Sequence, residues 1–170
     1  MEMNYCMHCG ARLEVRLHET EGRPVPWCPQ CADWRFPVFN AAVSMVVFNA
    51  EKTRILLIQQ YGRPFNILPA GYINKGEDAE SAVRRELEEE LGLQTAELRF
   101  NRSRYFPPSN TLLFNFAVAV TGEPRPNWEV DRWRWFTVEE AVREIKPESY
   151  AQAFLLHWLG HADWSGHHEE

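Results

Sequence analysis

Residues 71–93 read GYINKGEDAESAVRRELEEELGL, a glycine-containing loop that runs into a helix dense in carboxylates. Asp78 and Ser81 are both suitable N-caps for that helix, because their side-chain oxygens can accept from its first free N–H groups. Gly92 is placed to end the helix in the left-handed conformation. Any fold for this chain must therefore accommodate a short, well-delimited helix that carries many like charges.

The expected helix has two chemically different faces. An apolar stripe at helical spacing is expected to pack against a core and consists of Ala82, Val83, Leu87 and Leu91. Glu86 lies three residues before Glu89 and four before Glu90, so their carboxylates share a face with Cβ atoms roughly 5–6 Å apart. Like charges this close are unfavourable unless cations or protons lie between them. The spacing therefore predicts a divalent-metal site that faces a cleft.

A solvated helix face is the alternative interpretation of the same run. Arg84 with Glu88 and Arg85 with Glu89 would then form i,i+4 ion pairs. The loop glycines and Glu77 argue against this alternative, because a surface helix has no need of them. We therefore favour the metal site, since hard cations such as Mg²⁺ take oxygen ligands.

The segment also matches the Nudix box, G-x5-E-x7-R-E-U-x-E-E-x-G-U with U an aliphatic residue, at every specified position. The matching residues are Gly71, Glu77, Arg85, Glu86, Leu87, Glu89, Glu90, Gly92 and Leu93. This resemblance implies a hydrolase that cleaves a diphosphate linked to another moiety, with Mg²⁺ or Mn²⁺ bound by the box glutamates. It also implies an α/β/α sandwich around a mixed sheet.

Individual roles follow from the resemblance to the Nudix family. The implied metal ligands are the carboxylates of Glu86, Glu89 and Glu90 and the carbonyl of Gly71. Glu89 alternatively serves as the base that takes a proton from water. Arg85 and Glu77 are expected to orient the ligands and the loop. Many Nudix enzymes use one more carboxylate from downstream, for which the candidates are Glu123, Glu129 and Asp131.

The four cysteines of the chain form two C-x2-C pairs separated by 18 residues, and they are Cys6, Cys9, Cys28 and Cys31. This spacing is typical of a zinc ribbon, in which four thiolates complete a tetrahedral shell, so a structural Zn²⁺ is expected. Two disulfides are the alternative, which a reducing compartment disfavours. The cysteines therefore predict a small zinc ribbon over residues 1–35.

Composition and charge limit what the rest of the chain can be. With 170 residues, of which 45% are hydrophobic, it can bury one sizeable core, expected over residues 36–160, followed by a flexible tail at 161–170. No apolar run approaches the roughly 18 residues that a membrane span needs, and the chain start has no hydrophobic signal region. A soluble, cytoplasmic protein is therefore expected. The net charge of −6 argues against general nucleic-acid binding, which depends on Lys and Arg.

Alternation and turn signals predict the elements of the main domain. The expected strands cover residues 41–48, 54–60, 97–105, 111–120 and 132–136, with the first two forming a hairpin. Thr137 followed by Glu140 is a capping-box signal for one helix. Ser149 followed by Gln152 is a similar signal for a second helix.

The combination of a four-cysteine ribbon and the box resembles the NADH pyrophosphatase branch of the Nudix family. That branch carries the signature S-Q-P-W-P-F-P-x-S, and the corresponding stretch here is NRSRYFPPS, residues 101–109. Phe106, Pro107 and Ser109 are kept, whereas the first half differs. The resemblance implies cleavage of the pyrophosphate bond of a nucleoside diphosphate derivative. NADH or NAD⁺ is the leading substrate, and ADP-ribose or another NDP-sugar is next.

Side chains near the box and the altered signature are candidates for holding the nucleotide. The aromatic candidates, which offer rings for stacking on a base, are Phe65, Tyr72, Tyr105 and Phe106. Arg102 and Arg104 could pair with an additional phosphate, because guanidinium binds phosphate in a bidentate manner. Packing in the core is the competing interpretation for the aromatic residues, and solvation at a strand edge is the competing interpretation for the arginines.

A non-catalytic module that senses a nucleotide, or that docks on a protein or RNA, is the second hypothesis. Retention of every box glutamate favours the enzyme. The expected partner is therefore a small-molecule nucleotide. Hydrolysis of a nicotinamide-capped RNA end lies between the two hypotheses and gains no support from the acidic composition. The sequence leaves open whether the chain forms a symmetric dimer.

Overall fold

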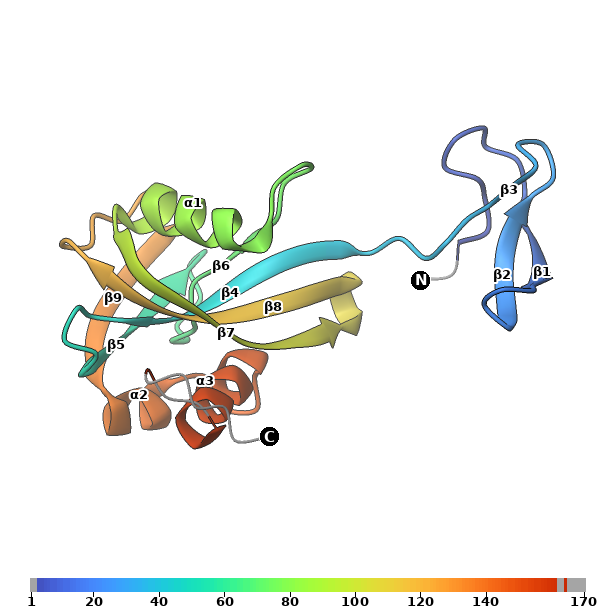
Figure 1. Cartoon of the computed structure of the whole chain (residues 1–170). Helices are drawn as coiled ribbons and strands as arrows, with labels where there is room; N and C mark the ends of the chain where they lie inside the picture. The colour runs from blue at the N-terminus through green and yellow to red at the C-terminus, as the bar shows by residue number, and fades with distance from the viewer. Residues whose placement is uncertain (1–2, 162–163, 165–170) are drawn as a thin grey trace. The chain divides into compact units, whose positions relative to one another are not determined.

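The structure is a computed structural model that describes residues 3–161 and residue 164 (Figure 1). The chain divides into two compact units, Met1–Asn40 and Ala41–Glu170. The boundary falls a few residues beyond the expected join between residues 35 and 36. The tail expected at 161–170 lies outside the described residues except for His161 and Trp164.

The N-terminal unit contains a three-stranded antiparallel sheet. Its strands are Glu14–His18 (β1), Arg23–Cys28 (β2) and Asp33–Trp34 (β3), in the order β1-β2-β3. Among its described residues, only Cys6, Val25 and Cys28 are buried. A unit this small with so little apolar burial needs a further source of stability, such as a metal or disulfides.

The second unit is organised around a six-stranded sheet. Its strands are Asn40–Phe48 (β4), Arg54–Gln60 (β5), Ala70–Tyr72 (β6), Gln94–Phe106 (β7), Thr111–Thr121 (β8) and Val130–Thr137 (β9). Their order is β7-β8-β4-β5-β9, and β6 pairs with β4. β4 and β5 pair antiparallel, which confirms the predicted hairpin. β7 and β9 form the two ends of the strand order, so both are edge strands.

Three helices cover the two faces of this sheet. Ala79–Leu91 (α1) lies on one face, whereas Val138–Glu144 (α2) and Tyr150–His161 (α3) lie on the other (Figure 1). The predicted apolar stripe of α1 is fully buried in the core cluster on its side of the sheet. Phe154, Leu155 and Trp158 of α3 pack with Ala141 of α2 in a second cluster. This is the α/β/α sandwich that the resemblance implied.

The ends of α1 are set by local chemistry. Asp78 is the N-cap, because its side chain accepts a hydrogen bond from the backbone N–H of Ser81 at 2.7 Å. Ser81, the other candidate cap, lies inside the helix. Gly92 has a φ of +65° and ends the helix in the left-handed conformation, as predicted. The carboxylates therefore occupy the middle and last turns of a helix whose position is fixed at both ends.

The two C-terminal helices begin differently. Thr137 and Glu140 form both halves of the predicted capping box of α2. Ser149 makes only one half, since its Oγ accepts from the backbone N–H of Gln152 at 3.1 Å while the Gln152 side chain accepts from the N–H of Glu148 at 2.9 Å. Among the described residues, no helix is long and apolar enough to cross a membrane.

Candidate active site

Helix α1 carries the box carboxylates to the wall of a cavity of about 500 Å³. Glu86 and Glu90, one turn apart, expose only 9% and 5% of their surfaces. Glu89 also lines the cavity but is exposed to solvent. Two carboxylates of one helix that are this deeply buried rule out the solvated-face interpretation, because a solvated face keeps its charges in water.

Gly71 must be glycine because the Glu86 carboxylate occupies the space of a side chain. A Cβ built on Gly71 would lie closer than 3.0 Å to the Cδ, Oε1 and Oε2 atoms of Glu86. The backbone of Gly71 is held in β6, opposite Val43 of β4. Its φ lies outside the left-handed region, so space rather than backbone conformation requires glycine here.

Arg85 connects the loop before α1 to the carboxylates. Its guanidinium binds Glu77 through two hydrogen bonds of 2.8 and 2.9 Å. The same group donates to Glu86 at 2.7 Å and to Glu89 at 3.1 Å. It also donates to the backbone carbonyl of Tyr72 at 2.9 Å. Arg85 therefore restricts the rotamers of two expected metal ligands and ties them to β6.

Replacement of Glu77 by glutamine is expected to lower stability in a pH-dependent manner. Hydrogen bonds from Arg85, and one from the N–H of Asn74, lower the pKa of Glu77 from 4.5 to about 2. The stabilising contribution of a carboxyl with a lowered folded-state pKa is complete above the unfolded pKa and is lost as the pH falls through the folded pKa. At pH 7, Glu77→Gln should therefore reduce the free energy of unfolding.

Urea denaturation of both proteins at a series of pH values checks this expectation. The difference in the free energy of unfolding should be constant between pH 7 and pH 5. It should then narrow as the pH falls below about 4.5. A difference that stays the same down to pH 3.5 would show that the Glu77 carboxylate is not what stabilises the loop.

The surroundings of Glu90 in this cavity raise the pKa of its carboxyl group. Burial, and then the charges of Glu86 and Glu129, raise the pKa of Glu90 to about 7. The Nε2 of Gln60 donates to its Oε2 at 3.2 Å and acts in the opposite direction. A carboxyl with this pKa takes up a proton or a cation readily near neutral pH.

The three candidate downstream carboxylates lie in different places. Glu129 lines the same cavity as Glu86, Glu89 and Glu90, which we call the glutamate cavity. Its carboxylate accepts a hydrogen bond from the hydroxyl of Tyr61, and this raises the pKa of Tyr61 to about 12. Asp131 instead accepts from the backbone N–H of Gly62 at 2.6 Å. Glu123 lines a separate cavity of about 450 Å³. Glu129 is therefore the downstream carboxylate that joins the box glutamates.

Backbone hydrogen bonds explain how Glu129 reaches this position. The N–H of Arg125 donates to the carbonyl of Leu91 at 2.7 Å, and the N–H of Asn127 donates to the carbonyl of Glu90 at 2.9 Å. The side chain of Asn127 in turn accepts from the N–H of Glu129 at 2.8 Å. The loop before β9 thus satisfies free carbonyls at the end of α1 and brings Glu129 to the cavity.

The cavity continues onto the other face of β6. Side chains alternate along a strand, so Ala70 and Tyr72 point away from the face on which Gly71 meets the carboxylates. Further residues line this half of the cavity, and they are Ala42, Ser109, Thr111 and Leu113. The acidic half can hold cations and phosphates, whereas this half can accept an uncharged ring and its hydroxyl groups.

Only one of the six side chains proposed to hold the substrate lines this cavity, and it is Tyr72. Phe65 lies elsewhere, with the Nζ of Lys146 at 4.7 Å from its ring centroid. Phe106 packs edge-on against the ring of Tyr150 at 5.0 Å, and its side chain thereby faces α3.

The polar residues of the altered signature also face other partners. The guanidinium of Arg104 lies 5.4 Å from the ring centroid of Tyr150, and the hydroxyl of Tyr105 bonds to Asn110. Arg102 pairs in register with Asn115 of β8. The segment 101–109 therefore mainly joins β7 to β8 and α3, and Ser109 is its contribution to the cavity.

The sequence reasoning missed several lining residues, among them Gln60, Tyr61, Thr111 and Leu113. No motif marks them, because strand pairing brings them to the site from distant parts of the chain. Tyr61 has a φ of +55°, which is uncommon for a bulky residue, but the sequence gives no sign of that conformation.

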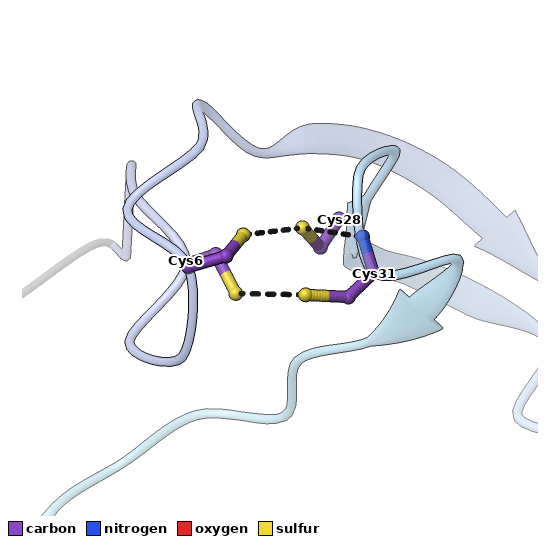
Figure 2. Close-up of side chains that lie close together, drawn as sticks. Cys6, Cys28 and Cys31 are labelled. Atoms are coloured by element: carbon purple, nitrogen blue, oxygen red, sulfur yellow. Dashed lines mark hydrogen bonds between the residues drawn. The ribbon is translucent and has the colours of Figure 1, made fainter.

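Four cysteine sulfurs converge in the N-terminal unit (Figure 2). All four lie within 4.8 Å of one another, with Cys6 to Cys31 at 3.9 Å and Cys9 to Cys28 at 3.5 Å. These are free thiols, because a disulfide bond is about 2.05 Å long. A tetrahedral site with Zn–S distances of about 2.3 Å has edges of about 3.8 Å. The cluster therefore fits a four-thiolate Zn²⁺ site.

A family model described as the NUDIX domain matches residues 38–159, well over half of the 170 residues. The chain belongs to the Nudix family. The Nudix box lies inside the matched range, and the four-cysteine cluster precedes that range in the chain.

Curated relatives of this Nudix chain include two NAD-capped RNA hydrolases. The chain is 36% identical over 126 residues to NAD-capped RNA hydrolase NUDT12 of Macaca fascicularis, covering 71% of this chain and 27% of that protein. It is 28% identical over 137 residues to NAD-capped RNA hydrolase NudC of Pseudomonas aeruginosa, covering 79% of this chain and 48% of that protein. The chain therefore spans about half the length of these relatives or less.

Solved Nudix structures share the fold. A NUDIX hydrolase from Nitrosomonas europaea superposes with a TM-score of 0.69 at 20% identity, covering 92% of this chain and 90% of that chain. The NUDIX domain of NrtR from Shewanella oneidensis, solved as a complex with ADP ribose, superposes with a TM-score of 0.60 at 15% identity, covering 77% and 90%. These superpositions confirm the predicted fold class.

The Nudix carboxylates form a donor set suited to a hard divalent cation. Glu86, Glu89, Glu90 and Glu129 supply the oxygen atoms that Mg²⁺ and Mn²⁺ prefer. Among the described residues, the four cysteines are the one group of three or more His, Cys, Asp or Glu side chains whose ligand atoms all lie within 4.8 Å of one another. The carboxylate oxygens of the glutamates are spread more widely than that. The glutamates therefore line a cavity with room between them for ions and phosphate oxygens. The raised pKa of Glu90 is consistent with a need for positive charge there.

Metal chelation is expected to unfold the N-terminal unit while the Nudix domain stays folded. The described residues of that unit bury few apolar side chains, so a bound Zn²⁺ would supply most of its stability. Trp27 and Trp34, whose rings meet edge-on at 4.9 Å, should give a near-ultraviolet circular dichroism signal that reports on this unit. That signal should disappear with chelator and return with added Zn²⁺. Loss of the signal on adding a reductant alone would instead indicate disulfides.

Proposed function

We propose that this chain is a divalent-metal-dependent hydrolase that cleaves the pyrophosphate bond of a nucleoside diphosphate derivative. NADH or NAD⁺ is the leading substrate, followed by ADP-ribose and other NDP-sugars. The observation that carries the proposal is the cavity in which Glu86, Glu89, Glu90 and Glu129 meet. The similarity to two NAD-capped RNA hydrolases supports NAD-type substrates.

The four carboxylates would hold Mg²⁺ or Mn²⁺, which when bound neutralises phosphate charge and makes a bound water more acidic. Arg85 holds Glu86 and Glu89 through direct hydrogen bonds, and Glu77 in turn holds Arg85. This arrangement keeps the carboxylates oriented before substrate arrives. We assign the carbonyl of Gly71 as a further ligand, in keeping with its place in the box.

Proton transfer is assigned to the carboxyls at the edge and the base of the cavity. Glu89 is exposed and takes a proton from the attacking water, or else serves as a further ligand. Before a cation binds, Glu90 can hold a proton at neutral pH because burial raises its pKa to about 7, and a bound cation would displace that proton. Gln60 fixes one of its oxygens. Acid–base groups work best when their pKa lies near the working pH.

The substrate is expected to lie across β6. Its diphosphate would enter the acidic half of the cavity, whereas a base or ribose would occupy the half lined by Tyr72, Ser109 and Thr111. The Tyr72 side chain is 58% exposed, so its ring has a free surface on which a base can stack.

A nicotinamide-capped RNA end is the second candidate substrate, because the two relatives above are NAD-capped RNA hydrolases. The capped end contains the same type of pyrophosphate bond as NAD⁺, so one cavity can serve both. The net charge of −6 still argues against general, sequence-independent RNA binding.

A screen of dinucleotides, NDP-sugars and a capped oligoribonucleotide with Mg²⁺ and Mn²⁺ tests the proposal. Products identified by mass establish both the substrate and the cleaved bond. We expect NAD⁺ or NADH to yield a mononucleotide and AMP. Ligand binding without product in either metal would favour the nucleotide-sensing module instead.

A further inference from the structure

A second cavity, of about 310 Å³, lies against the edge strand β9. Arg132 and Arg134 line it from β9, and Gln59 lines it from β5. The two arginines are two residues apart on a strand, so their side chains lie on the same face. In the strand register, Arg132 is opposite Gln59 and Arg134 is opposite Leu57. One side of the cavity therefore presents two guanidinium groups.

The wall that faces these arginines is held by amide hydrogen bonds. The Nε2 of Gln59 donates to the Oδ1 of Asn66 at 3.0 Å. The Nδ2 of Asn66 donates to the backbone carbonyl of Glu144 at 3.1 Å. Both amides are therefore occupied in shaping the wall, and the groups left to bind a ligand are the guanidiniums.

The two guanidiniums are not neutralised within the part of the chain that the structure describes. Neither Arg132 nor Arg134 makes an ion pair there, and Arg134 lies over the ring of Phe136 at 4.9 Å. Glu144 is the one carboxylate among the described lining residues, and it pairs with Arg143 at 3.3 Å. In a chain of net charge −6, this cavity carries local positive charge and thus favours an anion.

The second cavity and the glutamate cavity lie at the same end of β9 but on opposite faces of the sheet. Gln60 bonds to Glu90 of α1, whereas Gln59 bonds to Asn66 on the face covered by α2. Gln60 and Tyr61 line the glutamate cavity and immediately follow Gln59, which lines the second cavity. At the start of β9, Glu129 belongs to the first cavity and Arg132 to the second. Because β9 is an edge strand, an extended single-stranded chain can pass around it and reach both cavities.

We propose that Arg132 and Arg134 form a phosphate-binding site that holds a substrate phosphate outside the hydrolysed pyrophosphate. Guanidinium groups bind phosphate oxygens in a bidentate manner, which gives both charge and geometry. The site rests on the proposed function, because it adds a second anchor for the same substrate. The phosphate belongs to the RNA chain attached to a nicotinamide cap, because NAD⁺ carries no phosphate outside its pyrophosphate.

A second pair of arginines offers a matched control. Arg102 and Arg104 have the same spacing and lie on β7, the opposite edge strand of the sheet. They are not among the residues that line the glutamate cavity or the second cavity. Replacing either pair with glutamine removes two positive charges, so any difference between the two double variants reports position rather than net charge.

The test measures binding by the full chain carrying Glu90→Gln, so that turnover does not consume the ligand. The probe is a fluorescent single-stranded oligoribonucleotide with a 5′ NAD cap, titrated at several salt concentrations. Arg132→Gln with Arg134→Gln should raise Kd by roughly tenfold and reduce the salt slope of log Kd by about 0.7 for each phosphate that is no longer neutralised. Arg102→Gln with Arg104→Gln should change the slope by less than half as much.

The substitutions Arg132→Lys and Arg134→Lys, made together, distinguish a loss of phosphate recognition from a loss of folding. They keep the charge but lose the bidentate geometry, so the salt slope should return while the affinity is only partly restored. NAD⁺ and inorganic phosphate, added as competitors, identify the source of the phosphate. Weakening limited to the oligoribonucleotide assigns the phosphate to the RNA chain. Equal weakening for NAD⁺ would contradict a phosphate outside the pyrophosphate, and equal weakening for inorganic phosphate would show that the arginines bind any phosphate.

Equal Kd values and salt slopes for the two glutamine double variants would overturn the phosphate site. The proposed hydrolase fails by a different result, namely no product from NAD⁺ or the capped oligoribonucleotide with the unsubstituted chain and either metal. The binding measurement remains interpretable in that case, so the two failures can be told apart.

Discussion

Glu90→Gln is expected to lower the turnover of NAD⁺ or NADH by at least about 100-fold. Glutamine has nearly the same shape as glutamate but carries no charge, so it removes a metal ligand and a proton-holding group together. Glu90 is 5% exposed and accepts a hydrogen bond from Gln60, so the carboxylate is held in a defined position in the cavity. Turnover is measured from product formation at saturating substrate, with zinc content and circular dichroism recorded alongside.

Glu88→Gln is the matched control for this variant. Glu88 belongs to the same helix but is exposed, and it accepts only a 3.3 Å hydrogen bond from the side chain of Gln94. Its turnover should stay within about twofold of the unsubstituted chain, as expected for a solvated surface charge. Glu89→Gln should behave like Glu90→Gln. Retained activity in both Glu89→Gln and Glu90→Gln would refute the assigned site.

Stability measurements distinguish lost catalysis from lost folding. The pKa of Glu90 is raised to about 7, so its stabilising contribution is present below pH 4.5 and is lost as the pH rises through 7. Above pH 7, Glu90→Gln removes a buried charge that is costly to ionise. Without added Mg²⁺ or Mn²⁺, the variant should therefore be at least as stable as the unsubstituted chain at pH 8.

Gly71→Ala is expected to have the second large effect, again with a loss of turnover of at least about 100-fold. The added methyl group would overlap the carboxylate of Glu86, so either that side chain or β6 must move. Overpacking of this kind costs about 1–3 kcal/mol in the free energy of unfolding. Activity assays and urea denaturation of the same preparations measure the two effects.

Gly160→Ala provides the comparison for Gly71→Ala. A Cβ on Gly160 in α3 meets nothing within 4 Å, so alanine should be neutral or stabilise the helix by up to about 1 kcal/mol. Combining Gly71→Ala with Glu86→Asp shortens the clashing side chain. The double variant should recover part of the stability lost by Gly71→Ala, and strictly additive losses would show that Glu86 is not the group that alanine displaces.

Local features of this chain could be predicted because their causes are local. Asp78 and Gly92 delimit α1 through contacts within a few residues, and the capping box at Thr137 acts over three residues. The burial of the apolar stripe follows from helical spacing, and so does the shared face of Glu86 and Glu90. The sequence therefore suffices for the acidic helix and for the fold class.

Long-range features could not be predicted, because strand pairing and loop contacts decide them. Glu129 reaches the cavity through backbone hydrogen bonds to the end of α1, and no spacing in the sequence marks it above Glu123 or Asp131. Tyr61 enters from the end of β5. The steric requirement at Gly71 is visible only when the Glu86 carboxylate is in place.

In the segment 101–109, similarity to the family signature did not predict which side chains line the cavity. Phe106 and Arg104 contact Tyr150 of α3, and Ser109 is the residue of this segment that lines the cavity. The family signature drew attention to the right stretch of chain. Which of its side chains meets a ligand depends on the direction in which β7 and the following turn present them, and that direction is set by α3.

The position of β6 between two kinds of surface has a consequence for how this domain can diversify. On one side of the strand, Gly71 meets the carboxylate of Glu86, and on the other Tyr72 and Ala70 meet the remainder of the cavity. Substitutions at 70, 72 or 111 are therefore expected to change substrate preference while leaving the acidic side untouched. Because β6 separates the two halves of the cavity, we expect substrate preference to change without any change in the carboxylates.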